Sequence, residues 1–188
     1  DLIMSIFEYV MVLVSIIVGL GITHMLKGLV KIIQDKNRNL YWIHLVWSFN
    51  IFFTLIFFWW WQYKLIDIQQ WTFALYIFVI VFALIYYILS TLLFPEKLLV
   101  TYKEYYFDKR KWIFGILLLS IIIDYFDTLN KGMDYMKSLG FEYQIQVVVF
   151  SIMAMIAIKT KNEIYHALFA LINFAYQIQQ GFRYYSSF

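Results

Sequence analysis

Two aspartates inside an apolar segment are the strongest candidates for a functional site in this sequence. Asp124 and Asp127 interrupt the apolar run over residues 112–130, and Asp124 lies about 18 Å from its start at the rise of an α-helix. A carboxylate at such a depth in a bilayer has to be neutralised, paired or hydrated. We expect an ion pair with Arg183 or Lys131, an outward-facing site for a proton, cation or cationic solute, or snorkelling from a tilted helix.

Further polar side chains recur at helical spacing in the other apolar segments. Those of residues 162–184 repeat about every 3.5 residues, which puts them on one face of a helix, and Asn50 shares a face with Thr54 in the same way. Two interpretations remain open: dry hydrogen bonds between helices, worth about 0.6 kcal/mol each, or a wet cavity. The residues that we expect to line a path for an ion or solute are Asp124, Asp127, Glu8, Asn50, Asn173, Gln177, Gln180 and Arg183.

The three histidines could in principle bind a metal ion or haem, because all of them fall near one end of the apolar segments. His24 ends one segment, whereas His44 and His166 begin two others. No His-x-x-x-His or Glu-x-x-His spacing accompanies them, and histidines are common at membrane interfaces. We therefore expect no metal site and no cofactor.

Small residues in the first apolar segment predict close helix packing. Ser15, Gly19 and Thr23 are spaced by four residues, which is the small-xxx-small pattern of membrane helix pairs. Gly21 and Gly28 lie on another face of the same helix. We expect this helix to pack on two sides, at the centre of the bundle or of an oligomer.

We expect membrane helices to carry all of these residues. The chain has 188 residues, of which 63% are hydrophobic and 14% charged, against about 25% charged in a typical soluble domain. Such a surplus of apolar surface predicts an all-α, polytopic membrane helical bundle of about six transmembrane helices in a single domain, residues 1–188. The segments are 2–33, 41–63, 71–94, 112–130, 141–158 and 162–184, and the longest predicted loop runs from Pro95 to Lys111.

The distribution of basic residues predicts the orientation of the bundle. Of the 15 Lys and Arg residues, most flank the first, third and fifth loops, for example Lys36, Arg38, Lys109 and Lys161. The positive-inside rule makes these loops cytoplasmic and puts both termini outside. The first segment is expected to be retained rather than cleaved, because Glu8 stands where a signal peptide would be basic.

A short internal similarity raises the hypothesis of two inverted three-helix halves. Ser-Ile-Ile-Val at residues 15–18 resembles Ser-Ile-Ile-Ile at residues 120–123, and Thr23 and Thr128 follow at the same offset. Inverted repeats of this kind occur in many transporters. Chance similarity between Ile-rich segments is the competing explanation.

Several stretches resemble those of uncharacterised bacterial multi-pass inner-membrane proteins. They are FEYV at residues 7–10, SIIVGLGIT at 15–23, YWIH at 41–44 and DYFDT at 124–128. The resemblance covers most of the chain and carries over no activity. Together with the Ile-, Lys- and Tyr-rich composition of an AT-rich bacterium, it favours the bacterial cytoplasmic membrane.

Three classes of function remain for such a chain. The polar stripes favour a small channel or transporter with a polar intramembrane cavity. The near absence of soluble mass favours, as an alternative, a non-catalytic accessory subunit of a larger membrane complex or a homo-oligomer in the lipid bilayer. A membrane signalling or defence component is the second alternative. An enzyme is not predicted, because there is no cysteine, phosphate-binding loop or nucleophile motif, and no segment is basic enough to bind nucleic acid.

Overall fold

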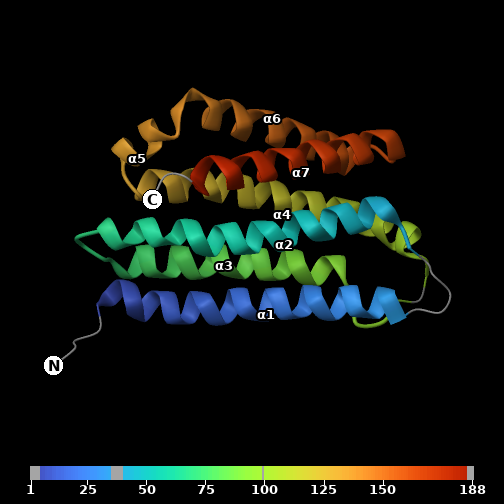
Figure 1. Cartoon of the computed structure of the whole chain (residues 1–188), viewed down its shortest axis with the longest axis horizontal. Coiled ribbons are helices and arrows are strands. Elements are labelled where there is room, and N and C mark those ends of the chain that lie inside the picture. The colour runs from blue at the N-terminus through green and yellow to red at the C-terminus, as the bar shows by residue number, and fades with distance from the viewer. Residues whose placement is uncertain (1–4, 35–39, 99, 186–188) are drawn as a thin grey trace.

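The regular structure of the described residues is helical, as predicted (Figure 1). The computed structural model describes residues 5–34, 40–98 and 100–185; the predicted loop-one residues Lys36 and Arg38 lie outside them. The elements are α1 (Ile6–Gln34), α2 (Trp42–Trp61), the 3-10 helix η1 (Gln62–Asp67), α3 (Phe73–Leu93), α4 (Tyr102–Asn130), α5 (Met133–Ser138), α6 (Gly140–Lys159) and α7 (Glu163–Tyr185).

Five of the described helices are long and apolar enough to cross a membrane. They are α1, α2 with its η1 extension, α3, α4 and α6. The sixth predicted segment does form a helix, α7, but polar side chains occupy one of its faces and it is not among these five. The structure therefore shows a helical bundle with five helices that could span a membrane by their length and composition, and not the six that the sequence predicted.

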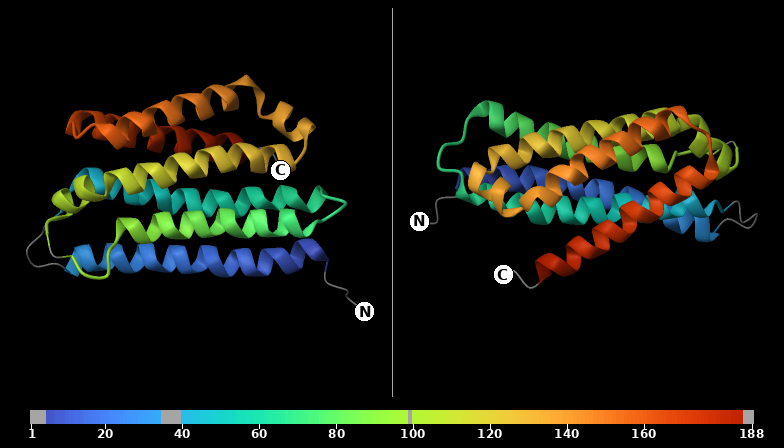
Figure 2. Two further views of the ribbon diagram at one scale, coloured as in Figure 1. Left: turned by 180° about the vertical axis from the view of Figure 1, so that it is seen from behind. Right: turned by 90° about the horizontal axis from the view of Figure 1, so that it is seen from above.

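The long helices run up and down, side by side, with the connections at the two ends of the bundle (Figure 1). Helix α1 lies at one edge and packs mainly on α3, which in turn contacts α4; α4 packs mainly on α6. Helix α7 crosses over to α2 and diverges from the other helices toward the C-terminus (Figure 2). The end with η1, α5 and both termini is called the cavity end below, and the opposite end the sealed end.

Helix α4 begins ten residues earlier than the sequence analysis predicted. The expected loop to Lys111 is wrong in its second half, because residues from Tyr102 onward are helical. A capping box starts the helix: the Thr101 side chain accepts the Glu104 amide, and the Glu104 carboxylate accepts the Thr101 amide. This Thr-x-x-Glu signature satisfies the first backbone donors and was readable in the sequence.

The sealed end is closed by side chains that bind the last carbonyl groups of α3. The Tyr105 hydroxyl donates to the Leu92 carbonyl at 2.9 Å, and the His44 and His24 Nε2 atoms lie 2.7 and 2.8 Å from the carbonyls of Leu93 and Phe94. A helix leaves its last carbonyls without intrahelical partners, and at bilayer depth there is little water to replace them. Three helices, α1, α2 and α4, therefore satisfy the end of α3.

Two glycines of α1 make the close approach that the small residues predicted, but on the other face of the helix. A Cβ atom at Gly28 would lie 2.1 Å from the Phe94 ring, and one at Gly21 would touch Leu55 and the Ser90 hydroxyl. Within the chain, the predicted packing face of Ser15, Gly19 and Thr23 is exposed, and nothing lies within 4 Å of a Cβ at Gly19. The Trp59 indole of α2 donates to the Ser15 hydroxyl at 2.9 Å, and that hydroxyl donates to the Met11 carbonyl of its own helix.

The two three-helix halves pack differently. Helix α1 makes its largest contact with the third helix of its half, α3, whereas α4 makes its largest contact with the next long helix, α6. The matched serines differ as well, since Ser15 is exposed and Ser120 is buried. The similarity of the two short stretches therefore does not extend to the way that they pack.

Candidate functional site

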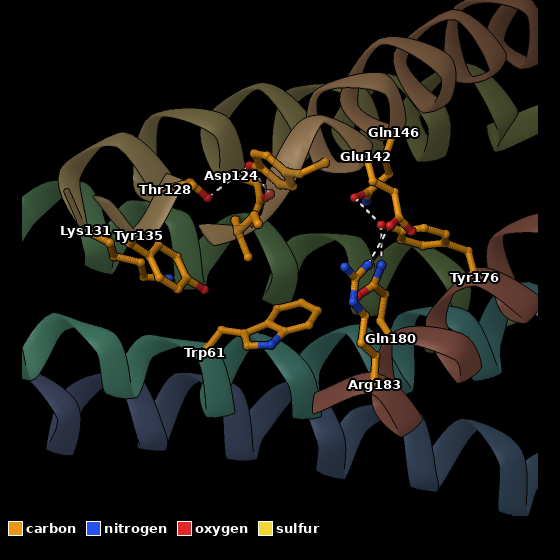
Figure 3. Close-up of a pocket in the computed structure, with 12 residues that line it drawn as sticks. Trp61, Asp124, Thr128, Lys131, Tyr135, Glu142, Gln146, Tyr176, Gln180 and Arg183 are labelled. Atoms are coloured by element: carbon orange, nitrogen blue, oxygen red, sulfur yellow. Dashed lines mark hydrogen bonds and ion pairs between the residues drawn. The ribbon is translucent and has the colours of Figure 1, made fainter. Parts of the chain in front are cut away.

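The polar stripes of α2, α4, α6 and α7 converge at the cavity end, where α7 diverges from α4. Two adjoining cavities of about 70 and 110 Å³ lie there, and together they form what we call the polar cavity. Both are lined by Trp61, Asp124, Gln146, Tyr176 and Gln180. The outer cavity is also lined by Thr128, Lys131, Tyr135, Leu139, Glu142, Tyr143 and Arg183 (Figure 3), and the inner one reaches Thr54, Tyr86, Ser120, Asn173 and Gln177.

Asp127 forms a buried ion pair beside the cavity. Its carboxylate lies 2.6 Å from the Lys131 ammonium, one helical turn further along α4, and accepts the Gln62 side-chain amide at 3.1 Å. Both charged side chains are less than 5% exposed. Of the two cations predicted as partners, Lys131 is therefore the partner of Asp127. Asp127 anchors η1 to α4 and does not itself line the cavity.

Arg183 pairs elsewhere, which corrects the predicted bridge from α7 to α4. Its guanidinium lies 2.5 Å from the Glu142 carboxylate of α6. Both side chains are about half exposed and line the mouth of the outer cavity. Figure 3 shows Arg183 and Gln180 of α7 facing Glu142 and Gln146 of α6 across this mouth. The pair joins α7 to α6 at the point where the helices separate.

Asp124 faces the cavity without a cationic partner. Its carboxylate accepts the Tyr143 hydroxyl at 2.9 Å, and among the described residues no ammonium or guanidinium lies within 4 Å of it. Tyr143 has one hydroxyl hydrogen and donates it to Asp124. The Thr128 hydroxyl, 3.0 Å from the Tyr143 hydroxyl, therefore has to donate to Tyr143. Asp124 is thus oriented by a short hydrogen-bonded chain and lines both cavities.

Amide and hydroxyl groups of α7 form the opposite wall. Gln180 donates to the Tyr176 hydroxyl at 2.5 Å, which donates to the Gln146 side-chain oxygen at 2.7 Å. Gln177 donates to both the Asn173 oxygen, at 2.9 Å, and the Thr54 hydroxyl, at 3.0 Å. The predicted residues Asn173, Gln177 and Gln180 are thus brought together with Asp124 around one cavity. The buried Oε1 atom of Gln177 has no protein partner.

Two predicted path residues lie outside the cavity. Asn50 is fully buried between α2 and α7, where its side-chain amide donates to the Ala170 carbonyl at 3.0 Å. Glu8 is exposed at the start of α1 and accepts the backbone amide of Ser5 at 2.7 Å, which makes it a helix cap. Neither residue lines either cavity.

The three histidines do not converge on one another. His24 and His44 bind carbonyls at the end of α3, and the His166 Nε2 atom lies 3.1 Å from the Thr160 carbonyl. Since that nitrogen has to donate to a carbonyl, the other ring nitrogen accepts the Tyr106 hydroxyl at 2.9 Å. No group of three metal-ligating His, Asp or Glu side chains occurs among the described residues.

The sequence analysis missed the aromatic part of the cavity. Trp61, Tyr135, Tyr143 and Tyr176 belong to four different helices, α2, α5, α6 and α7, and all line the outer cavity. Aromatic residues make up 22% of the chain, so no single one stood out. The one usable signal was the spacing of Glu142 and Gln146, which puts two polar side chains of α6 on the face shared with Tyr143.

The arrangement brings a hydrogen-bonded, unneutralised carboxylate to a small, partly enclosed cavity with polar and aromatic walls. Such a site can bind a cation or exchange a proton, because the negative charge of Asp124 is not cancelled by either ion pair of the cavity end. In comparisons with known protein families, curated proteins and solved structures, nothing matches this chain.

Proposed function

We propose that this chain is a small channel or transporter of the bacterial cytoplasmic membrane, with the polar cavity as part of its path and Asp124 as its central group. The supporting observation is the carboxylate of Asp124, which lines both cavities and has no cationic partner within 4 Å among the described residues. Unpaired carboxylates inside membrane bundles mark ion and solute pathways more often than structural contacts.

The proposal includes six spans, with α7 as the sixth. An amphipathic helix suits this position, because its polar face turns toward the cavity and its apolar residues, such as Leu168, Leu171 and Ile178, are exposed toward the lipid. An even number of spans puts both termini on one side, as in Figure 1. The basic loops at the sealed end then face the cytoplasm, and the polar cavity opens outward.

Cysteine accessibility tests whether the cavity is wet, and the chain offers a clean background since it has no cysteine of its own. Single cysteines at Thr128, Gln146 and Gln177 should react with a membrane-impermeant, charged thiol reagent added outside intact vesicles. Matched cysteines at the exposed positions Ile122 and Val148, which line neither cavity, should stay unreactive. Equal protection of all five positions would contradict a wet cavity.

Flux in liposomes tests the function itself. Purified protein should let at least one of H⁺, Na⁺ or choline cross the bilayer under an imposed membrane potential, and Asp124→Asn should lower that flux by at least tenfold. Asp134→Asn is the control, because Asp134 is exposed on α5 and outside the cavity. Flux of no cation by folded protein, or full flux by Asp124→Asn, would overturn the proposal.

One observation favours the alternative of a non-catalytic subunit. The face of Ser15, Gly19 and Thr23 on α1 is exposed at the edge of the bundle, with open space at Gly19, and such faces pair membrane helices closely. If the chain works as a subunit or homo-oligomer, Gly19→Leu should reduce cross-linking between chains in the membrane. A single monomeric species in mild detergent, with no cross-linking in vesicles, would exclude this alternative.

A further inference from the structure

We propose that the polar cavity binds a small organic ammonium ion, with the Asp124 carboxylate and the surrounding aromatic rings as its recognition elements. This inference rests on the proposed function in one respect, since it names the class of solute for the same cavity.

The charge of the cavity lining favours a monovalent cation. Four side chains of the acidic and basic residue types line the outer cavity: Asp124, Lys131, Glu142 and Arg183. Glu142 and Arg183 neutralise each other, and Lys131 is neutralised by Asp127 behind it. One negative charge is left over, on Asp124. The Asp124 carboxylate would repel an anionic solute, whereas a solute with a single positive charge would neutralise it.

The rings of the cavity provide the surface that an alkylammonium ion prefers. Trp61, Tyr135, Tyr143 and Tyr176 line it, and aromatic faces attract cations, most strongly when the site is shielded from water. One ammonium group of the protein itself, that of Lys131, already lies near an aromatic ring and a carboxylate beside this cavity. The Lys131 nitrogen lies 5.9 Å from the centre of the Tyr135 ring and 2.6 Å from the Asp127 carboxylate.

Asp124 and Asp127 are three residues apart on α4, so their side chains lie on neighbouring positions of one helix face. Asp127 has a lysine ammonium and a ring beside it, whereas Asp124 has rings nearby and no ammonium within 4 Å. In Figure 3 the side chains of Asp124 and Trp61 stand on opposite sides of the pocket. We infer that a solute ammonium takes at Asp124 the place that Lys131 takes at Asp127.

The oxygen atoms of the cavity suit a divalent metal cation poorly. Metal cations such as Ca²⁺ take six to eight oxygen ligands, roughly, and Mg²⁺ about six. Here the Gln146 oxygen already accepts the Tyr176 hydroxyl and the Asn173 oxygen accepts the Gln177 amide, while Asp124 accepts Tyr143. An ammonium ion needs only the carboxylate and the ring faces. The cavity volumes, about 70 and 110 Å³, lie below the roughly 300–1,000 Å³ of drug-sized sites, which favours a small amine.

Binding of choline to the purified full chain tests the inference, with its neutral isostere 3,3-dimethyl-1-butanol and NaCl as matched probes. Isothermal titration should detect choline, with binding at least tenfold weaker for the isostere and no competition by Na⁺ at equal ionic strength. Asp124→Asn should weaken choline binding at least tenfold, and Asp134→Asn should leave it unchanged.

The rings are tested separately, because Asp124→Asn alters the hydrogen bond from Tyr143 as well as the charge. Trp61→Leu keeps Asp124 and Tyr143 intact and should weaken choline binding about fivefold, whereas Trp61→Phe should retain most of the affinity. A choline-dependent rise in thermal midpoint confirms that each variant binds in its folded state. Equal binding of the neutral isostere, or unchanged binding by both Asp124→Asn and Trp61→Leu, would overturn the inference.

The outcomes of the two experiments separate the two proposals. Asp124-dependent flux of H⁺ or Na⁺ without choline binding would overturn the organic cation and leave transport standing. Choline binding that depends on Asp124 and Trp61, in protein that conducts no cation, would support the ligand class and overturn transport. Flux and binding of choline that both fail in Asp124→Asn would support both.

Discussion

The two ends of the bundle use polar side chains in opposite ways. At the sealed end, Tyr105, His44 and His24 each bind a backbone carbonyl at the end of α3. At the cavity end, side chains such as Tyr143 and Gln177 bind other side chains around an open volume. The sealed end also has a surface hollow, lined by charged residues such as Lys103, Glu104 and Lys161, but the three side chains that bind the end of α3 do not line it.

The difference shows what a polar residue in an apolar helix can mean. A backbone carbonyl is fixed by its helix, so a side chain bound to it closes the structure and leaves no room for a ligand. A side chain bound to another side chain can exchange its partner for water or a solute at little cost, because both groups can rotate. The residues that bind side chains, rather than those that bind the backbone, are therefore the candidates for function.

The largest effect on stability is expected for the buried ion pair of the cavity end. Asp127→Asn leaves the Lys131 charge buried without its partner, which should cost about 3–5 kcal/mol in the free energy of unfolding. Denaturation of the purified protein in detergent measures this, with the exposed Asp134→Asn as a control within about 0.5 kcal/mol.

A double variant sharpens the same test. Asp127→Asn with Lys131→Met removes both charges and should recover most of the lost stability, because no buried charge is left unpaired. If the single variant loses less than about 1 kcal/mol, water already reaches the pair, and the cavity extends behind Lys131.

The close packing of the sealed end is expected to give the next largest effect. Gly28→Ala puts a methyl group 2.1 Å from the Phe94 ring, closer than atoms can approach, so α1 or the end of α3 has to shift. We expect a loss of about 1–3 kcal/mol, measured as the shift of the denaturation midpoint. Gly19→Ala is the matched control on the same helix. It meets open space and should gain up to about 1 kcal/mol from helix propensity.

A smaller effect is expected for one hydrogen bond to the end of α3. Tyr105→Phe removes the hydroxyl that donates to the Leu92 carbonyl and should cost about 0.5–1.5 kcal/mol, with faster backbone hydrogen exchange at the end of α3. Tyr9→Phe, at a ring that is 63% exposed, should change neither quantity. Unchanged exchange in Tyr105→Phe would mean that the sealed end does not depend on side-chain caps.

The smallest effect is expected for the ion pair on the surface of the sealed end. Lys103 of α4 pairs with Glu163 at the start of α7, and both side chains are about half exposed. Glu163→Gln should cost no more than about 1 kcal/mol, and the loss should vanish at high salt because exposed pairs are screened. A larger loss of stability that does not depend on salt would mean that water reaches this ion pair less than the exposed fractions of its side chains indicate.

The sequence was enough to predict which helix faces form the candidate site, but it was not enough to predict which charged side chains pair there. The stripe of Asn173, Gln177 and Gln180 and the depth of Asp124 follow from helical period and composition alone, and the structure brings all four to one cavity. Arg183 was assigned to the aspartates because both were charged and lay at the same end. The pairing of cations with carboxylates depends on the relative positions of the helices, which the 3.6-residue period does not specify. In the structure, Arg183 binds Glu142 instead.

Local sequence signals were enough to predict the helical class, the positions of the long segments to within a few residues except at the start of α4, and the polar side of α7. These properties are local: they depend on runs of apolar residues, on the 3.6-residue period and on capping signals such as Thr101 and Glu104. The three-dimensional structure was needed to show that α7 diverges from α4, that Gly28 rather than Gly19 packs closely, and that Asp124 has no cation within 4 Å. Those facts depend on distances between segments far apart in the chain, and such distances are set by how all the helices pack at once.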